Sequence, residues 1–169
     1  YAPYAAPYWA PEGWQAEHIV SVDIADVSLL PENAKPYQER IELAIDHHPS
    51  QGFFARNTCL EADSAACGEI VHALLTELGV TVTKRIAECL YTAISTDTGC
   101  FKFSNTTANT HRTAAALIEA GADVYSINKV FFDTKSFSRL RMEAKLTETM
   151  EFYADGTVGV CVKIGRAHV

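Results

Sequence analysis

The stretch Ile41 to Ser50, IELAIDHHPS, places a short apolar segment directly before an Asp-His-His triplet. The β-branched and apolar character of Ile41 to Asp46 is typical of a buried strand. The stretch His18 to Asp23, HIVSVD, has the same character and also ends at a carboxylate. Because the carboxyl ends of parallel strands face one ligand crevice in open α/β sheets, we expect Asp23 and Asp46 to His48 to converge there.

Segments with helical spacing alternate with these strands. A third short strand is expected over Asn57 to Leu60, and Val27 to Arg40 is expected to hold a helical turn or two. Apolar residues recur at helical spacing in 65–78, 83–95, 108–120 and the segment that begins at 123. Strands that alternate with helices predict an α/β domain with a parallel, doubly wound sheet.

The predicted organisation has an α/β domain over 17–134, a connector helix over 135–152 and the first strand of a second α/β domain within 153–163. Residues 1–16 contain the Pro- and aromatic-rich run YAPYAAPYWAPEGW, which predicts a linker. Residues 164–169, IGRAHV, interrupt a strand pattern and match one reading frame of a common sequencing adapter. We therefore expect an adapter-derived end and leave His168 out of the site.

Composition and charge restrict the class of protein. The 169 residues are 48% hydrophobic, which is enough for one domain with a buried core. The formal net charge of -7 supplies no broad cationic surface, so we expect no binding to long duplex DNA. The apolar stretches are shorter than the roughly 20 residues of a membrane helix. Five scattered cysteines without a C-x-x-C pair favour reduced thiols, and we expect a cytoplasmic protein without a membrane partner.

Three carboxylates each close an apolar segment, namely Asp23, Asp46 and Asp97. Two unpaired carboxylates about 4 Å apart repel by roughly 4 kcal/mol at an effective dielectric of 20, and a bound cation removes that cost. Clustered oxygens with imidazole nitrogen suit Mn²⁺, Mg²⁺ or Fe²⁺. Asp23 alone is also explained as a cap, and Asp97 as a helix end. Adjacent His47 and His48 favour a function, because a strand end gains no stability from two titratable rings.

These motifs resemble those of the DHH phosphoesterase family. VDIAD (Val22 to Asp26) is similar to the second motif of the family, DHH (Asp46 to His48) to the third, and STDTGCFKFSNT (Ser95 to Thr106) to the fourth. The long fourth motif and SRLRMEAK (Ser138 to Lys145) most resemble the cytoplasmic subgroup that degrades very short RNA and dephosphorylates 3'-phosphoadenosine 5'-phosphate (pAp). The resemblance spans His18 to Lys163.

The resemblance implies a role for each matched residue. Asp23 would bridge two divalent metal ions, and His47 and Asp97 would each ligate one. His48 would face the substrate phosphate as a catalytic residue. Asp46, the second catalytic candidate, would orient the histidines by hydrogen bonds to ring N–H groups.

The resemblance also gives candidates for substrate binding. Ser104, Asn105 and Thr106 are candidate phosphate or ribose contacts, although they are equally explained as the cap of the helix that starts near Ala108. Arg139 on the connector, with its neighbour Arg141, is a candidate for contact with substrate phosphate. The alternative for both arginines is a solvated helix charge.

The implied reaction is hydrolysis in which paired Mn²⁺ ions, roughly 3.5 to 4 Å apart, activate a bridging water for in-line attack on phosphorus. The expected substrates are short oligoribonucleotides, trimmed from an end, and pAp, and a homodimer is left open. The alternative enzyme is a cyclic dinucleotide phosphodiesterase of the c-di-AMP type.

The chain departs from the family pattern in one important respect. The first motif of the family, an upstream strand end with a His and two Asp ligands, has no counterpart here. Most of the C-terminal DHH-associated domain, with its Gly-rich substrate-binding motif, is also missing. We therefore expect that the chain by itself is an inactive truncated piece that binds at most one metal weakly.

Overall fold

The computed structural model describes residues 16–161, which divide into one compact unit that ends at Val124 and another that starts at Tyr125. The predicted linker, apart from residue 16, and the predicted adapter-derived end lie outside the described residues. Among the described helices, none is both long and apolar enough to span a bilayer.

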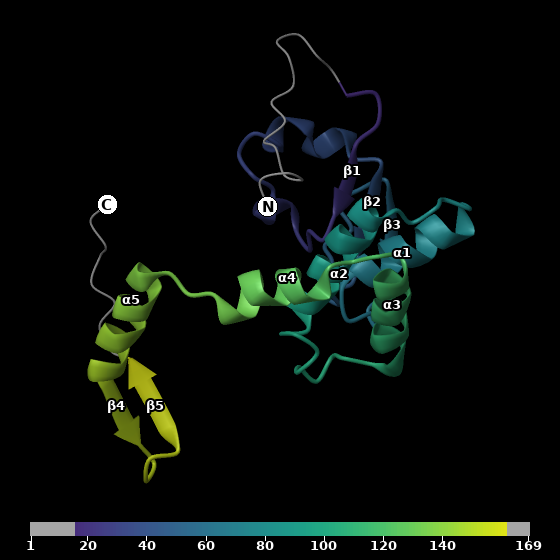
Figure 1. Cartoon of the computed structure of the whole chain (residues 1–169). Helices are drawn as coiled ribbons and strands as arrows, with labels where there is room; N and C mark the ends of the chain where they lie inside the picture. Colours follow the sequence, from purple (N-terminus) through teal and green to yellow (C-terminus); the bar gives the residue numbers. More distant parts are fainter. Residues whose placement is uncertain (1–15, 162–169) are drawn as a thin grey trace. The chain divides into compact units, whose positions relative to one another are not determined.

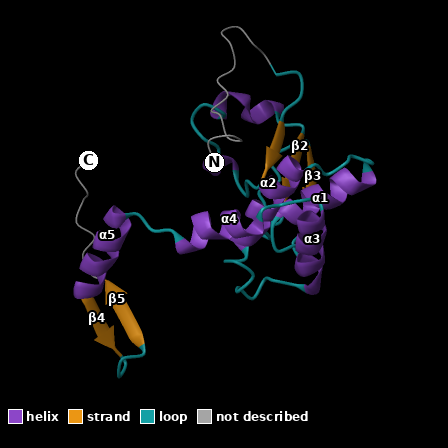
Figure 2. Ribbon diagram, in the orientation of Figure 1, coloured by secondary structure: helices purple, strands orange, loops and turns teal. Residues whose placement is uncertain are grey.

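The first unit is built on a parallel sheet of three strands, drawn in orange in Figure 2. Its strands are β1 (Val20–Val22), β2 (Leu43–Asp46) and β3 (Asn57–Leu60), in the order β1-β2-β3. Val22 is in register with Ile45, which is in register with Cys59. All three strands occur where the sequence predicts them, and the predicted α/β fold with a parallel sheet is confirmed. The strands therefore end side by side at one edge of the sheet (Figure 1).

The crossover from β1 to β2 is made of two 3₁₀ helices, η1 (Val27–Leu29) and η2 (Lys35–Arg40). Asp26 caps η1, because its side chain accepts a hydrogen bond of 2.8 Å from the backbone N–H of Ser28. A proline lies in the first turn of η2, where its missing N–H costs no hydrogen bond. The crossover is thus short, as expected for this segment.

Three helices follow the sheet, namely α1 (Cys67–Glu77), α2 (Lys84–Asp97) and α3 (Ala108–Glu119). Helix α1 packs on β2 through a buried cluster of Ile45, Cys67 and Ile70. Gly68 lets α1 approach α2, because a Cβ at this position would lie 3.1 Å from the Cβ of Ala93. The end of α2 is anchored by Ile94, which has no exposed surface. Burial of these apolar side chains fixes the position of the last residue of α2 beside the strand ends.

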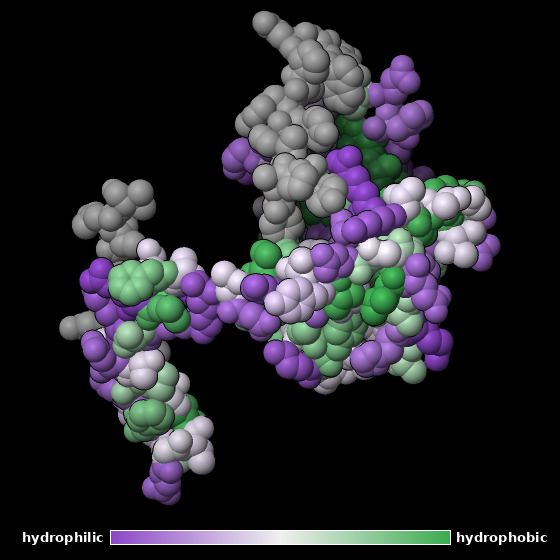
Figure 3. All heavy atoms as spheres, in the orientation of Figure 1, coloured by the Kyte–Doolittle hydropathy of each residue, from purple (hydrophilic) through white to green (hydrophobic). Residues whose placement is uncertain are grey.

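The second unit contains most of α4 (Val124–Asn128), a π-helical turn η3 (Lys129–Asp133), α5 (Phe137–Glu148), β4 (Met150–Tyr153) and β5 (Val158–Cys161). The helix predicted to continue to residue 152 ends at Glu148 instead. Its last predicted residues form β4, which pairs antiparallel with β5. The connecting turn uses left-handed backbone, with φ of 53° at Asp155 and 85° at Gly156. The hairpin exposes large apolar side chains, seen as green spheres in Figure 3.

Candidate metal centre

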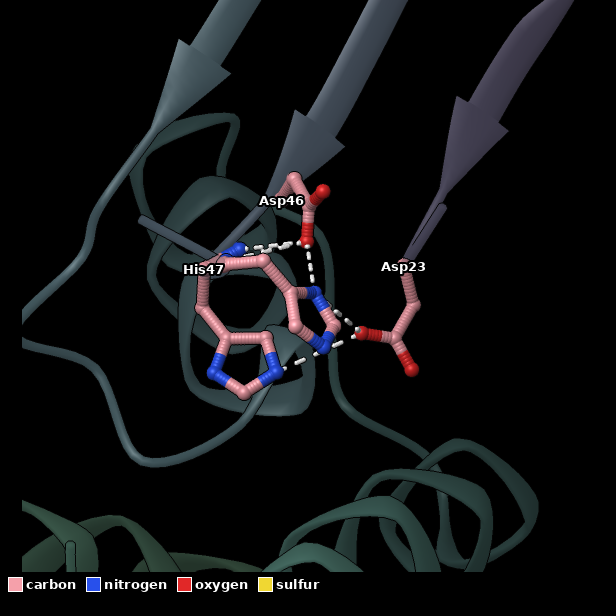
Figure 4. Close-up of side chains that lie close together, drawn as sticks. Asp23, Asp46 and His47 are labelled. Carbon is pink, nitrogen blue, oxygen red and sulfur yellow. Dashed lines mark hydrogen bonds and ion pairs between the residues drawn. The ribbon is translucent and has the colours of Figure 1, made fainter. Parts of the chain in front are cut away.

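Asp23, His47 and Asp97 meet at the edge where the strands end. Asp23 follows β1, His47 follows β2, and Asp97 is the last residue of α2. The Nε2 atom of His47 lies 3.4 Å from Oδ1 of Asp23 and 3.6 Å from Oδ2 of Asp97. Figure 4 shows Asp23 and His47 pointing toward one another. The convergence expected from the strand-end positions is therefore present in the fold.

Asp23 occupies its place through an unusual backbone conformation. Its φ is 63°, in the left-handed region that Asp tolerates better than most residues. Its N–H still donates a hydrogen bond of 3.0 Å to the carbonyl of Ile45, which extends the pairing of β1 with β2 by one residue. The chain turns away at this point, and the exposed carboxylate is left beside His47.

Asp46 is completely buried, and both of its oxygens are used by donors of the protein. Oδ1 accepts from the backbone N–H of His47 at 2.7 Å and of His48 at 3.2 Å, and from Nδ1 of His48 at 2.7 Å. Oδ2 accepts from Nε2 of Gln51 at 2.6 Å. Burial raises the pKa of Asp46, but the hydrogen bonds from His48 and His47 outweigh it and hold this pKa below its ordinary value. Asp46 is thus an anion whose lone pairs face the two histidines and Gln51.

Both histidines are oriented by hydrogen bonds at Nδ1. Nδ1 of His47 lies 3.1 Å from the carbonyl oxygen of Ser64, which can only accept, so Nδ1 carries the proton and Nε2 offers its lone pair to the cluster. Nδ1 of His48 is bound to Asp46, and this hydrogen bond raises the pKa of His48. The rings lie 4.4 Å apart between centroids. His47 is therefore arranged as a ligand, and His48 as a group that stays protonated to higher pH.

The negative charge of Asp97 is only partly compensated by its neighbours. Burial of the carboxyl and the negative charge of Asp23 raise the pKa of Asp97, and the two histidines offset this in part. Two carboxylates and one imidazole nitrogen at short range form a donor set suited to Mn²⁺, Mg²⁺ or Fe²⁺. A divalent cation would remove the repulsion between Asp23 and Asp97, so the residues present fit such an ion.

One donor atom from each of four residues lies within 4.8 Å of the others, and this group contains Asp46 but not Asp97. The four residues are Asp23, Asp46, His47 and His48. Hydrogen bonding decides between the two aspartates, because Asp46 has no oxygen without a protein donor. Asp97 contacts the cluster through His47, and its side-chain oxygens accept no hydrogen bond from another residue of the described range 16–161. The geometry therefore favours Asp97 over Asp46 as a ligand.

The loop after α2 is held against the site by Asn105. Its side-chain nitrogen donates to the carbonyl of Ala65 at 3.1 Å and of Asp97 at 3.2 Å. The cap of α3 is Thr107, which forms a reciprocal capping box with Thr110. Ser104, Asn105 and Thr106 are therefore not the cap of α3.

The other predicted substrate contacts have no tested role. Ser104 is exposed, and the half-buried Thr106 has a buried hydroxyl oxygen that lacks a hydrogen-bond partner within the described part of the chain. In the second unit, Nε of Arg139 lies 3.0 Å from Oε1 of Glu143, and Arg141 lies over the ring of Phe137. Both arginines thus have local partners, and their contact with substrate stays a prediction.

Sequence reasoning missed two groups that orient the site, Gln51 and the carbonyl of Ser64. Neither belongs to a periodic pattern, and a backbone carbonyl has no residue signature. For Gln51, the available signal was a polar side chain five residues after Asp46, in the loop that returns past the end of β1.

Comparison with known proteins finds relatives named as phosphatases, although no family model matches the chain. The chain is 33% identical over 115 residues to the bifunctional oligoribonuclease and PAP phosphatase NrnA of Thermus thermophilus, a match that covers 68% of the chain and 36% of that protein. It is 22% identical over 155 residues to the protein of the same name from Bacillus subtilis, with 90% of the chain and 49% of that protein covered.

A solved structure has a fold similar to that of the chain. The fold is similar to that of an exopolyphosphatase-related protein from Bacteroides fragilis, with a TM-score of 0.74 and 26% identity over 82% of the chain and 42% of that protein. The chain thus spans between 36% and 49% of the length of these relatives.

Proposed function

The chain belongs to the DHH family of phosphoesterases, and on this premise we propose that it carries part of the metal centre of a hydrolase that acts on short oligoribonucleotides and on pAp. One observation carries the proposal. Nε2 of His47 lies within 3.6 Å of carboxylate oxygens from both Asp23 and Asp97. The names of two relatives, which are oligoribonuclease and PAP phosphatases, support the choice of substrates.

In this proposal Asp23, His47 and Asp97 hold divalent ions, with Mn²⁺ as the first choice and Mg²⁺ or Fe²⁺ as alternatives. Such ions neutralise phosphate charge and lower the pKa of bound water. They would also allow a protein with a net charge of -7 to bind a small polyanion. The carboxylates then need no protein cation beside them.

His48 and Asp46 act together on the substrate side. Asp46 fixes Nδ1 of His48 as a donor, so that Nε2 of this ring is left for a phosphate oxygen. The hydrogen bond with Asp46 raises the pKa of His48 and so favours the positively charged form of the ring. His48 would then stabilise the charge that develops on phosphate oxygens during hydrolysis.

The companion predictions extend the proposal. We infer a cytoplasmic location from the reduced-thiol pattern of the sequence, and we expect the chain by itself to be inactive because it lacks the first motif of the family. Substrate contacts by Ser104, Asn105, Thr106 and Arg139 belong to the same hypothesis.

The proposal is tested by Mn²⁺ binding to the chain and by Mn²⁺-dependent release of mononucleotides from short RNA by a chain extended with the first motif. His47→Gln should abolish both, whereas His72→Gln, a matched change on α1, should leave both unchanged. Undiminished Mn²⁺ affinity and mononucleotide release in the His47 variant would overturn the assignment.

A further inference from the structure

Gln51 connects the two strand ends that carry the candidate ligands. The residue is 4% exposed and lies in the loop after β2. Its Nε2 donates to Oδ2 of Asp46 at 2.6 Å and to the carbonyl of Ile24 at 3.0 Å. We propose that Gln51 is a positioning residue that sets the metal site by joining the end of β1 to the end of β2. This inference rests on the proposed function.

The orientation of the Gln51 amide follows from its partners. Its Oε1 accepts from the backbone N–H of Phe53 at 3.1 Å, and a backbone N–H can only donate. The carbonyl of Ile24, on the other side, can only accept. A flipped amide would place like groups together at both contacts, so the NH₂ group faces Asp46. Both N–H donors of Gln51 are therefore used inside the protein.

This orientation has a consequence for Asp46. Oδ2 receives a hydrogen bond from Gln51, while Oδ1 is shared among His47 and His48. The carboxylate is thereby held from both sides and cannot turn away from the histidines. Gln51 thus acts on His47 and His48 through Asp46 without touching either ring.

The same loop also holds the backbone that follows Asp23. The N–H of Gly52 donates to the carbonyl of Ala25 at 2.7 Å. A Cβ at Gly52 would lie 3.0 Å from Oδ2 of Asp26, which shows how closely the loop lies against this segment. Together with the bond from Gln51 to Ile24, this contact fixes the chain beyond β1. The separation of 3.4 Å between Asp23 and His47 therefore depends on Gln51 at both ends.

The test replaces the donor by an acceptor of the same shape. Gln51→Glu would place a carboxylate oxygen against Oδ2 of Asp46 and against the carbonyl of Ile24. We expect the Mn²⁺ dissociation constant, measured by calorimetry on the chain, to rise about ten- to a hundredfold, as is usual when a group that orients metal ligands is lost. Gln38→Glu is the matched control, because within residues 16–161 the side chain of Gln38 makes a single hydrogen bond, of 3.4 Å to Glu39, and the residue lies on η2, outside the cluster.

A spectroscopic measurement separates positioning from loss of fold. With Co²⁺ in place of Mn²⁺, the visible absorption bands report the ligand geometry of each bound ion. Gln51→Glu should shift these bands, whereas a purely structural role would reduce the bound fraction and leave the bands in place. Unshifted bands in the folded variant would overturn the inference, whether or not the dissociation constant changes.

A second variant decides the matter if Gln51→Glu does not fold. Gln51→Met keeps the volume and removes the hydrogen bonds without adding a charge, and it should raise the Mn²⁺ dissociation constant about tenfold. If this folded variant binds as the unmodified chain does, the role of Gln51 is refuted and the proposed function stands. If the unmodified chain binds no Mn²⁺, the proposed function fails, and the inference fails with it.

Discussion

The first unit contains one cluster around Glu69 and another around Asp23 and Asp97. The two clusters differ in how many hydrogen-bond donors reach their carboxylates. Glu69 on α1 is 4% exposed and accepts hydrogen bonds from the N–H of Ala65, from Thr110 and from Asn109, at 3.3, 2.8 and 2.9 Å. Within residues 16–161, the carboxylate oxygens of Asp23 and Asp97 have only contacts of 3.4 Å or more, all with histidine side chains. The first cluster is complete by itself, whereas the second lacks partners for its charge.

The difference teaches how to tell a structural carboxylate from a candidate ligand. A buried carboxylate that receives several donors stabilises the elements it joins, here α1 and α3. Carboxylates that face each other without donors raise the free energy of the folded state unless a cation binds. Asp46, although next to the histidines, belongs with Glu69, because protein donors occupy both of its oxygens.

The largest effect on stability is expected at Glu69. Glu69→Ala would leave the buried N–H of Ala65 and the buried hydroxyl of Thr110 without this acceptor, and it should lower the free energy of unfolding by about 3 kcal/mol. Urea denaturation measures this change, with the exposed Glu77→Ala on the same helix as the control. A loss below about 1 kcal/mol would mean that the Glu69 cluster contributes no more than an ordinary hydrogen bond.

Removal of a carboxylate from the cluster of Asp23 and Asp97 should raise the free energy of unfolding, whereas its removal at Glu69 should lower it. Asp97→Asn removes a like charge from the neighbourhood of Asp23, so the metal-free chain should become slightly more stable. Its Mn²⁺ dissociation constant should nevertheless rise on the order of a hundredfold or more, because even groups outside the metal shell cost ten- to a hundredfold. Calorimetric titration provides the measurement. Asp155→Asn in the hairpin turn is the control, and equal affinity in both variants would contradict the prediction.

Mn²⁺ itself provides a third comparison of the two clusters. At ten times its dissociation constant, Mn²⁺ should raise the free energy of unfolding of the unmodified chain by about 1.4 kcal/mol. Glu69→Gln should gain the same increment, since its cluster has no need of a cation, and Asp97→Asn should gain none. Denaturation with and without Mn²⁺ measures both increments. A smaller Mn²⁺-induced increase in Glu69→Gln would contradict the view that the two clusters are independent.

The smallest expected effect concerns the helix start that supplies donors to Glu69. Thr107→Ala removes the cap of α3 and should lower the free energy of unfolding by about 1 kcal/mol, with no change in Mn²⁺ affinity. Thr147→Ala on the exposed side of α5 is the matched control and should be close to neutral. Weakened Mn²⁺ binding in Thr107→Ala would show that the two clusters are coupled.

The sequence predicted the sheet and the convergence of the site because both follow from local pattern. Apolar runs that end in Asp23 and Asp46 mark the strand ends, and parallel strands bring such ends together. Hydrogen bonds such as those of Gln51 depend on how a loop returns, which no periodicity records. Strand β4 was missed for a similar reason, since Met150–Tyr153 continues a helical pattern and becomes a strand only by pairing with β5.

Position 23 must meet two separate requirements: a residue that adopts a left-handed backbone conformation and a side chain that supplies a negative charge. Only Gly, Asn and Asp adopt such a conformation at low cost, and of these three only Asp adds a negatively charged oxygen. A saturation library at this position would accordingly fall into three phenotypes. Gly and Asn would preserve the folded chain without its cation affinity, bulky or β-branched residues would impair both, and Asp alone would satisfy both demands.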